Sequence, residues 1–404
     1  MTALRKAQVI TSSKGFAAML FSIAASPVLN KAGVSFQTIT IGYGILYTIL
    51  AAVQIPTGVW ADVFGTKRAT VLGGLCQTLA MVLLGLGSIH SWQILAGFAL
   101  YGLGTSLLTR SIAALTFEST RNEDRENFNS NRFVSVTEKA AVASYILASF
   151  FVGFLAEYMG RSSLLIGGVF FLGTSLFVAF RFSELSGKRT QETIQKEFIV
   201  RIKESYSIIV KSAELKALLP IRMLHQVESI LGVMWLPWVQ QLGGGSAKWY
   251  SVVATGSYIF RYLVNHELSK CPRPESYMRR VTLSLLLMAV GCSICVVADN
   301  VWMALFGIWT MAGARGAFLP AVQAIQHEEL TDSVRTTGLS ALNFSIDAMV
   351  AVSYFGAAMV IEKLTVASAW SISAISFLTA SAIGVIVWRT NQRLIFSQSA
   401  QTNV

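Results

Sequence analysis

The pattern of apolar and polar positions along the chain predicts about twelve membrane-spanning helices. A bilayer core of about 30 Å needs about 20 apolar residues per helical span, and the sequence supplies such runs repeatedly. The runs of the first half cover residues 10–29, 36–60, 70–88, 92–117, 133–157 and 162–182. Those of the second half cover residues 217–242, 249–264, 281–298, 302–325, 337–361 and 367–388. Unbroken apolar runs exclude a transmembrane β-barrel, whose strands alternate, and predict an all-α membrane protein.

A polar interval separates these runs into two groups of six. Residues 183–216 are rich in Lys, Arg, Glu and Gln, with Ile194, Phe198 and Ile202 recurring among the charges. This spacing indicates an amphipathic helix on the cytoplasmic surface. The predicted domains are therefore an N-terminal six-helix bundle (1–182), a cytoplasmic amphipathic linker (183–216) and a C-terminal six-helix bundle (217–404).

The two halves show weak internal similarity at an offset of about 210 residues. The matched residues fall at equivalent places in a six-plus-six plan: Pro27 with Pro237, Trp92 with Trp302, Glu118 with Glu328, and Arg125 with Arg335. Repeated halves of this kind are typical of transporters in which one half rocks against the other around a central site. We therefore expect two six-helix pseudo-repeats.

Composition and charge agree with a membrane protein. Hydrophobic residues make up 53% of the chain and charged residues only 13%, whereas a soluble chain carries about 25% charged residues. The net charge of +11 comes from Lys and Arg in alternate loops, and the other loops hold only Lys31, Arg161, Lys248 and Lys363. By the positive-inside rule, both termini face the cytoplasm. The basic excess thus indicates topology in an inner or plasma membrane, and no nucleic-acid partner is expected.

A glycine-containing motif follows the second span, between Gly58 and Arg68. Gly58 allows close helix approach, and Gly65 allows a tight turn. Asp62 can pair with a cation or cap a helix end, while Lys67 supplies a positive charge. A simple turn with topology-setting cations is the alternative interpretation.

The motif resembles the G-x-x-x-D-R-x-G-R-R signature between helices 2 and 3 of the major facilitator superfamily. Gly58, Asp62, Gly65 and Lys67 match the signature, whereas Val63 and Thr66 replace basic residues. Together with the helix plan, the resemblance covers nearly the whole chain. It implies the superfamily's fold, and it implies that Gly58, Asp62, Gly65, Lys67 and Arg68 form a cytoplasmic gating motif that latches the two halves.

Nine ionisable side chains fall inside predicted spans, where each charge costs at least about 2.5 kcal/mol. They are Lys14, Arg110, Glu138, Lys139, Arg222, His225, Glu228, Arg315 and Asp347. In the superfamily, helices 1, 4, 7 and 10 line the central cavity, and six of the nine residues fall on those helices. The resemblance therefore implies substrate contact for Arg110, Arg315, Lys14 and Arg222, although the last two can instead snorkel to the headgroups.

The remaining ionisable residues suit proton coupling or charge locks. Glu228 lies near mid-membrane, where a carboxyl group prefers its protonated form unless a cation pairs with it. With His225 beside it, Glu228 can take up and release protons, or it can form a salt bridge between two helices. Glu138, Lys139 and Asp347 favour structural or gating roles. With five cations against three carboxylates, we expect an anionic or zwitterionic organic solute.

Other function classes find less support in the sequence. No G-x-x-x-x-G-K-[ST] phosphate loop, H-E-x-x-H or G-x-S-x-G motif occurs, so neither an ATP-driven pump nor a hydrolase is indicated. Cys292 and Cys295 lie in an apolar span without a second pair, and no metal or cofactor is expected. The leading hypothesis is a monomeric, proton-coupled or otherwise ion-coupled secondary transporter with a small-molecule solute. A proton-coupled multidrug exporter, a membrane enzyme and a non-transporting sensor remain alternatives.

Overall fold

The computed structural model describes residues 1–123, 130–183, 207, 211–269, 277–329, 335–361 and 363–402. All regular secondary structure in these ranges is helical. Most of the interval predicted as an amphipathic linker helix, residues 184–206 and 208–210, lies outside the described residues.

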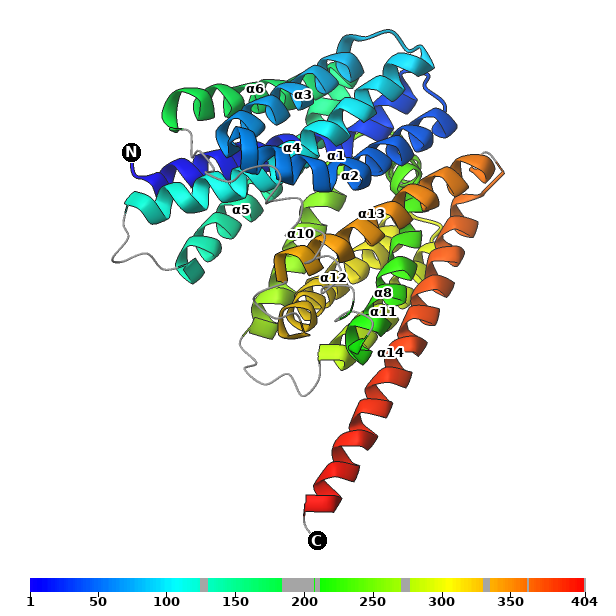
Figure 1. Cartoon of the computed structure of the whole chain (residues 1–404). Coiled ribbons are helices and arrows are strands. Elements are labelled where there is room, and N and C mark those ends of the chain that lie inside the picture. Colours follow the sequence, from blue (N-terminus) through cyan, green and yellow to red (C-terminus); the bar gives the residue numbers. More distant parts are fainter. Residues whose placement is uncertain are drawn as a thin grey trace. The chain divides into compact units, whose positions relative to one another are not determined.

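The helices follow the predicted spans closely (Figure 1). The first half contains α1 (Ala3–Lys31), α2 (Phe36–Phe64), α3 (Thr66–Leu86), α4 (Ser91–Glu123), α5 (Ser130–Met159), the 3₁₀ turn η1 (Gly160–Ser162) and α6 (Ser163–Arg181). The second half contains α8 (Ala213–His225), the 3₁₀ segment η2 (Gln226–Val233), α9 (Trp235–Leu242), α10 (Lys248–Ser269), α11 (Tyr277–Val296), α12 (Val301–Glu329), α13 (Arg335–Val360) and α14 (Val366–Thr402). Counting α8, η2 and α9 as one interrupted run, the described residues contain twelve helical runs, as predicted.

Most of these runs are long and apolar enough to cross a bilayer. Within the described residues, nine segments meet that condition by length and composition, and one of them, Lys139–Arg181, contains most of α5 and all of α6. The α8–η2–α9 run and α10 are not among them. The former is interrupted after a 13-residue helix, and the latter carries Arg261, His266 and Glu267 among its apolar residues.

The offset of about 210 residues is also visible in the structure. Helix α4 begins at residue 91 and α12 at residue 301, while α3 begins at residue 66 and α11 at residue 277. Trp92 and Trp302, the second residues of α4 and α12, are each 67% exposed. Exposed Trp at the end of a span is typical of an anchor at the membrane interface. The two halves are therefore pseudo-repeats, as the sequence predicts.

The chain forms two compact units, whose ranges interleave along the sequence. The first unit contains Met1–Lys196, Val233–Thr255 and Ala351–Lys363, and the second contains Glu197–Gly232, Gly256–Val350 and Leu364–Val404. In the first unit, α3 packs on α4 and α6, α2 packs on α4, and α1 packs on α5 and α6. In the second unit, α11 packs on α12 and α14, and α8 packs on α14. The boundaries predicted at residues 182 and 216 stay a prediction.

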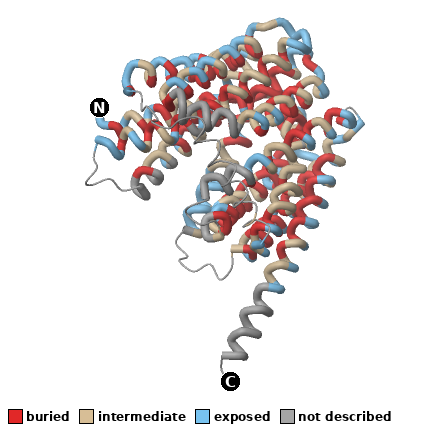
Figure 2. The backbone as a smooth tube through the Cα atoms, in the orientation of Figure 1, coloured by how far each residue is buried: buried red, intermediate tan, exposed pale blue. Residues whose placement is uncertain are grey.

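Each unit buries the helix faces that meet and exposes large apolar side chains on the others (Figure 2). Leu79 on α3, Phe150 on α5, Phe180 on α6, Leu287 on α11 and Ile375 on α14 are all exposed. In water such surfaces would mark binding patches or aggregation sites. On helices of membrane-spanning length they fit contact with lipid, which is as apolar as these side chains.

Glycines allow two helix pairs to approach closely. A Cβ atom on Gly104 of α4 would lie 2.7 Å from the carbonyl oxygen of Gly73 on α3. The second unit has a similar close approach between α11 and α12. A Cβ atom on Gly291 would lie 2.7 Å from the Gly307 carbonyl oxygen, and a Cβ atom on Gly307 would lie 2.7 Å from the Gly291 carbonyl oxygen. Small residues at such crossings are what membrane helices use to bring their backbones together.

The substitution Gly104→Ala should destabilise the protein, because its methyl group would meet backbone atoms of α3 that cannot rotate away. We expect a loss of about 1–3 kcal/mol in the free energy of unfolding, the usual cost of overpacking, measured by unfolding in detergent micelles. Gly173→Ala on α6 is the control, since nothing lies within 4 Å of a Cβ atom there. Equal stability of the two variants would contradict the close packing of α3 on α4.

Candidate functional site

Arg315 lies at the centre of α12, a helix that is long and apolar enough to cross a membrane. Its side chain is 34% exposed. A charge at membrane depth normally faces a water-filled space or a partner, and Arg315 has a partner, because it forms an ion pair.

The backbone beside Arg315 is held by close packing against α10. A Cβ atom on Gly316 would lie 2.5 Å from the carbonyl oxygen of Arg261. Four residues later, Pro320 has no N–H to donate to the Gly316 carbonyl, so the helical hydrogen bond at this point is missing. The glycine and the proline together fix where α12 presents Arg315.

The seventh predicted span is not one continuous α-helix, an interruption that the sequence pattern did not predict. Helix α8 ends at His225, eight residues of 3₁₀ helix follow in η2, and α9 begins at Trp235. Runs of 3₁₀ helix longer than three or four residues are uncommon and often mark functional positions. Pro237 cannot donate to the Val233 carbonyl, and the Ser26 hydroxyl donates to that carbonyl instead, at 2.9 Å.

Glu228 lies on η2 and forms an ion pair with Arg315, its Oε1 facing an Arg315 terminal nitrogen. The Glu228 side chain is only 15% exposed. The pair joins the interrupted seventh run to the centre of α12. An ion pair between two helices was one of the two roles that the sequence left open for Glu228.

Three more ionisable residues interact electrostatically with this pair or with one another. The His225 side chain is 7% exposed, and its ring stacks on Phe318 of α12 at 4.6 Å and 6° between ring planes. Arg222 and Arg315 both act electrostatically on His225, and Asp347 of α13 acts on Arg222. We call Arg222, His225, Glu228, Arg315 and Asp347 the charge cluster; all five belong to the second unit.

The charge cluster and the neighbouring Ser229 contain many of the buried polar atoms that lack a hydrogen-bond partner. In the described part of the chain there are twelve such side-chain atoms. Half of them are Arg222 Nε, both His225 ring nitrogens, Glu228 Oε2, Ser229 Oγ and Arg315 Nε. Each buried polar atom left in this way costs about 1–3 kcal/mol. Water or the polar groups of a ligand would satisfy these atoms, and their concentration makes this region the candidate site.

The predicted substrate-contact residues of the first half, Lys14 and Arg110, belong to the first unit. The Lys14 ammonium group on α1 donates to Thr109 Oγ1 on α4 at 3.2 Å, next to Arg110 in sequence. The side chains of Arg110 and Glu138 lie outside the described residues, and Lys139 is exposed on α5. Lys14 belongs to the first unit, so its role and those of Arg110, Glu138 and Lys139 stay predictions.

The glycine-containing motif forms the turn that its spacing predicts. Gly65 separates α2 from α3 with a φ of 105°, a conformation that favours glycine. Lys67 is half-buried and Arg68 exposed at the start of α3. The side-chain surroundings of Gly58 and Asp62 lie outside the described residues, so the gating role of the motif stays a prediction.

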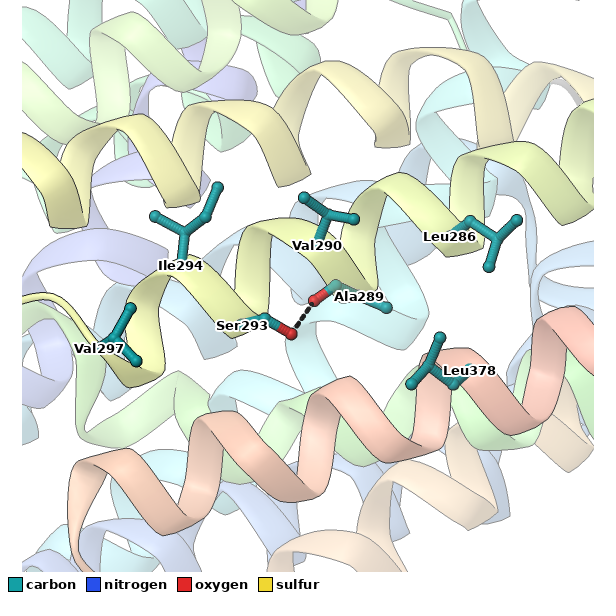
Figure 3. Close-up of a pocket in the computed structure, with 7 residues that line it drawn as sticks. All are labelled: Leu286, Ala289, Val290, Ser293, Ile294, Val297 and Leu378. Atoms are coloured by element: carbon teal, nitrogen blue, oxygen red, sulfur yellow. Dashed lines mark hydrogen bonds between the residues drawn. The ribbon is translucent and has the colours of Figure 1, made fainter.

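A hollow on the exposed side of α11 and α14 is apolar and does not suit a charged solute (Figure 3). Its volume is about 550 Å³, and Leu286, Val290, Ile294 and Leu378 are among its lining residues. The hydroxyl group of Ser293, which also lines the hollow, donates to the Ala289 carbonyl of its own helix at 2.9 Å. The hollow therefore offers apolar contact alone, as lipid chains require.

Comparison with known proteins supports the architecture. The family model described as Major Facilitator Superfamily matches residues 9–270. The solved structure of the nucleoside transporter NupG is similar, with a TM-score of 0.75 and 9% identity over 98% of this chain and 99% of that chain. A POT family transporter in complex with 5-aminolevulinic acid gives a TM-score of 0.75 and 10% identity over 95% of each chain.

A peptide transporter POT in complex with sulfate gives a TM-score of 0.73 and 15% identity, over 97% of this chain and 94% of that chain. At such identities the structural likeness shows the fold alone. No curated protein matches the sequence.

A double-mutant cycle should show that Glu228 and Arg315 are coupled energetically. Glu228→Gln and Arg315→Met each leave the other charge without its partner, whereas the double variant removes both charges. We therefore expect the two losses of unfolding free energy to be non-additive by about 0.5–3 kcal/mol. The measurement is unfolding in detergent micelles, and additive losses would show that the ion pair carries no stability.

Proposed function

The chain belongs to the Major Facilitator Superfamily, and we propose that it is a secondary active transporter that moves a small anionic or zwitterionic organic solute, coupled to protons. It is a multi-pass membrane transporter with an all-α fold. The observation that carries the finer proposal is the Glu228–Arg315 ion pair at the interrupted seventh run, surrounded by polar atoms without partners.

The charge cluster supports a solute with an acidic group. Guanidinium groups bind carboxylates and phosphates through two parallel hydrogen bonds, and Arg315 is partly exposed with its Nε free of protein partners. Glu228 and Asp347 offset the charges of Arg315 and Arg222. A solute that carries both an acidic and a basic group can therefore replace one ion pair by two new ones without leaving a net charge in the site.

Proton coupling follows from the competition for Arg315. An ionised Glu228 holds the guanidinium group, whereas a protonated Glu228 releases it to an acidic group of the solute. Binding of the proton and of the solute are then linked, because each is favoured in the presence of the other. Among the similar structures, one holds 5-aminolevulinic acid, which has both an amino and an acid group.

The topology and the other candidate residues complete the proposal. Both termini face the cytoplasm of an inner or plasma membrane, as the distribution of Lys and Arg favours. Lys14 and Arg110 of the first half contact the solute. The motif that ends at Lys67 and Arg68 acts as the cytoplasmic gate. The chain works as a monomer.

Reconstitution in liposomes that contain a pH-sensitive dye tests proton coupling. Organic acids, amino acids and cationic drugs are added in turn, and we expect proton movement with the acids or zwitterions. Glu228→Gln should abolish solute-driven proton movement while solute exchange across the membrane persists. Asp299→Asn, a change at an exposed loop carboxylate, is the control. Proton movement that survives in Glu228→Gln would overturn the role of Glu228, and movement with cationic drugs alone would favour a multidrug exporter.

The variant Arg315→Lys tests solute recognition separately. Lysine keeps the charge but loses the planar pair of donors, so we expect the apparent affinity for an acidic solute to fall about tenfold, a loss of about 1.4 kcal/mol. The measurement is the KM of radiotracer uptake. Arg261→Lys on α10, where the side chain is exposed, should leave KM unchanged. An unchanged KM in Arg315→Lys would remove Arg315 from the solute site.

A further inference from the structure

Helices α11 and α14 run beside each other in opposite directions within the second unit. The Ser381 hydroxyl of α14 donates to the Thr282 carbonyl of α11 at 3.2 Å. Leu286, later in α11, and Leu378, earlier in α14, line the same apolar hollow. The start of α11 is therefore next to the end of the membrane-spanning part of α14. The distribution of Lys and Arg favours the cytoplasmic side of the membrane for this end of the pair.

An arginine lies at this end of each helix. Arg279 is in the first turn of α11, Arg389 directly follows Trp388 on α14, and both arginines are exposed. The Arg279 guanidinium group lies over the Trp388 ring, 5.7 Å from its centroid. This contact joins the two helix ends, so Arg279 and Arg389 together make this end of the helix pair positively charged.

The two arginines also lie on the helix faces that line the hollow. Leu286 follows Arg279 by seven residues, about two turns, and Leu378 precedes Arg389 by eleven, about three turns. Residues that are whole turns apart share one face of a helix. Figure 3 shows Leu286 and Leu378 at the same end of the hollow, and this is the end nearer to the arginines.

The distance from the arginines to the hollow matches the depth of one lipid leaflet. At about 1.5 Å per residue, Leu286 lies about 10 Å from Arg279 along α11, and Leu378 lies about 16 Å from Arg389 along α14. Half of the hydrocarbon core of a bilayer is about 15 Å thick. An acyl chain whose headgroup lies at the arginines therefore reaches the hollow with its end.

Trp388 adds a hydrogen-bond donor at this end of the pair. Its indole N–H is buried and has no hydrogen-bond partner among the described residues, although buried Trp usually finds one. Water or a phosphate oxygen would satisfy this group. Guanidinium groups bind phosphate through two parallel hydrogen bonds. The donors at this end therefore suit a phosphate group, and the apolar surface beyond them suits an acyl chain.

We propose that this end of α11 and α14 binds one anionic phospholipid, with its phosphate held between Arg279 and Arg389 and the end of one acyl chain in the hollow. Contact with bulk lipid requires only the apolar faces, whereas the two arginines select the headgroup. A zwitterionic phospholipid carries a cation that offsets its phosphate, so the arginines hold it less strongly. Because α11 also packs on α12, which carries Arg315, the bound lipid stabilises the helices beside the charge cluster.

Native mass spectrometry of the purified protein in detergent micelles tests the site, with phosphatidylglycerol and phosphatidylcholine of the same acyl chains as probes. We expect phosphatidylglycerol to bind more tightly than phosphatidylcholine. Arg279→Gln and Arg389→Gln should each weaken its binding about fivefold, and together about 25-fold, which is the effect of one and of two basic residues near an anionic headgroup. Arg121→Gln, at the exposed end of α4 in the first unit, is the control and should leave binding unchanged.

The apolar part of the site is tested by Val290→Trp, which fills the hollow without changing a charge. We expect weaker binding of phosphatidylglycerol, because the end of its acyl chain is excluded from the hollow. Leu287→Trp is the matched control, since Leu287 is as exposed as Val290, at 51%, but does not line the hollow. Both variants keep Arg279 and Arg389, so they separate the contribution of the chain from that of the headgroup.

These outcomes are independent of transport, because no solute is present. Equal binding of the two lipids by the wild-type protein, or unchanged binding of phosphatidylglycerol in the double arginine variant, would overturn the site. Displacement of the lipid by inorganic phosphate would show a site for free anions and would overturn it too. A dimer that forms without lipid and is lost in Val290→Trp would instead assign the hollow to a second copy of the chain. If the double variant does not fold, Arg389→Gln takes its place, since it changes a single exposed side chain.

Discussion

The cost of placing a charge in a bilayer is the constraint on which the organisation of the second unit depends. Arg315 lies at the centre of a 29-residue helix, where an isolated guanidinium group would be strongly disfavoured. Its pairing with Glu228 offsets that cost, and the negative charge of Asp347 reduces the cost of burying Arg222. The Glu228–Arg315 ion pair therefore joins the seventh run to α12, and Asp347 of α13 acts electrostatically on Arg222 of the same run. In the proposed function, the same ion pair that stabilises this unit exchanges its partner for a charged group of the solute.

The interruption of the seventh run places a charged side chain, Glu228, on an irregular stretch of backbone. Pro237 removes one helical hydrogen bond, Ser26 satisfies the carbonyl that is left, and the eight residues before that point adopt a 3₁₀ helix. Glu228 and Ser229 lie on this segment. Irregular backbone at membrane depth is tolerated where it is buried in protein or lines a cavity, and discontinuous helices are where many transporters build their sites. The position of Glu228 on η2 thus agrees with a role in transport.

Much of the fold could be predicted from the sequence because the bilayer imposes a length and a polarity on every span. The apolar runs predicted the helices, the offset between the halves predicted the repeat, and Gly65 predicted the turn between α2 and α3. Glu228 and Arg315 were recognised as unusual because charge inside an apolar run stands out without any structure. Their pairing could not be predicted, since 87 residues separate them and local pattern says nothing about which helices meet.

The η2 interruption had only Pro237 as a signal, and a proline inside a membrane helix is commonly tolerated. Nothing in the sequence indicated that Gly153 of α5 lies close to the backbone of Ala247, just before α10. A single glycine in an apolar span says little until the neighbouring helix is known. Both features depend on a contact with another helix. Ser26 of α1 contacts the interrupted run, and Gly153 contacts the start of α10.

The central claim is that Glu228 links solute binding to proton binding through Arg315. Isothermal titration calorimetry of the purified protein, repeated in buffers of different ionisation enthalpy, measures directly how many protons accompany a bound solute. The account predicts that binding of an acidic or zwitterionic solute takes up about one proton and that this uptake disappears in Glu228→Gln. Solute binding by the wild-type protein with the same enthalpy in every buffer would contradict it.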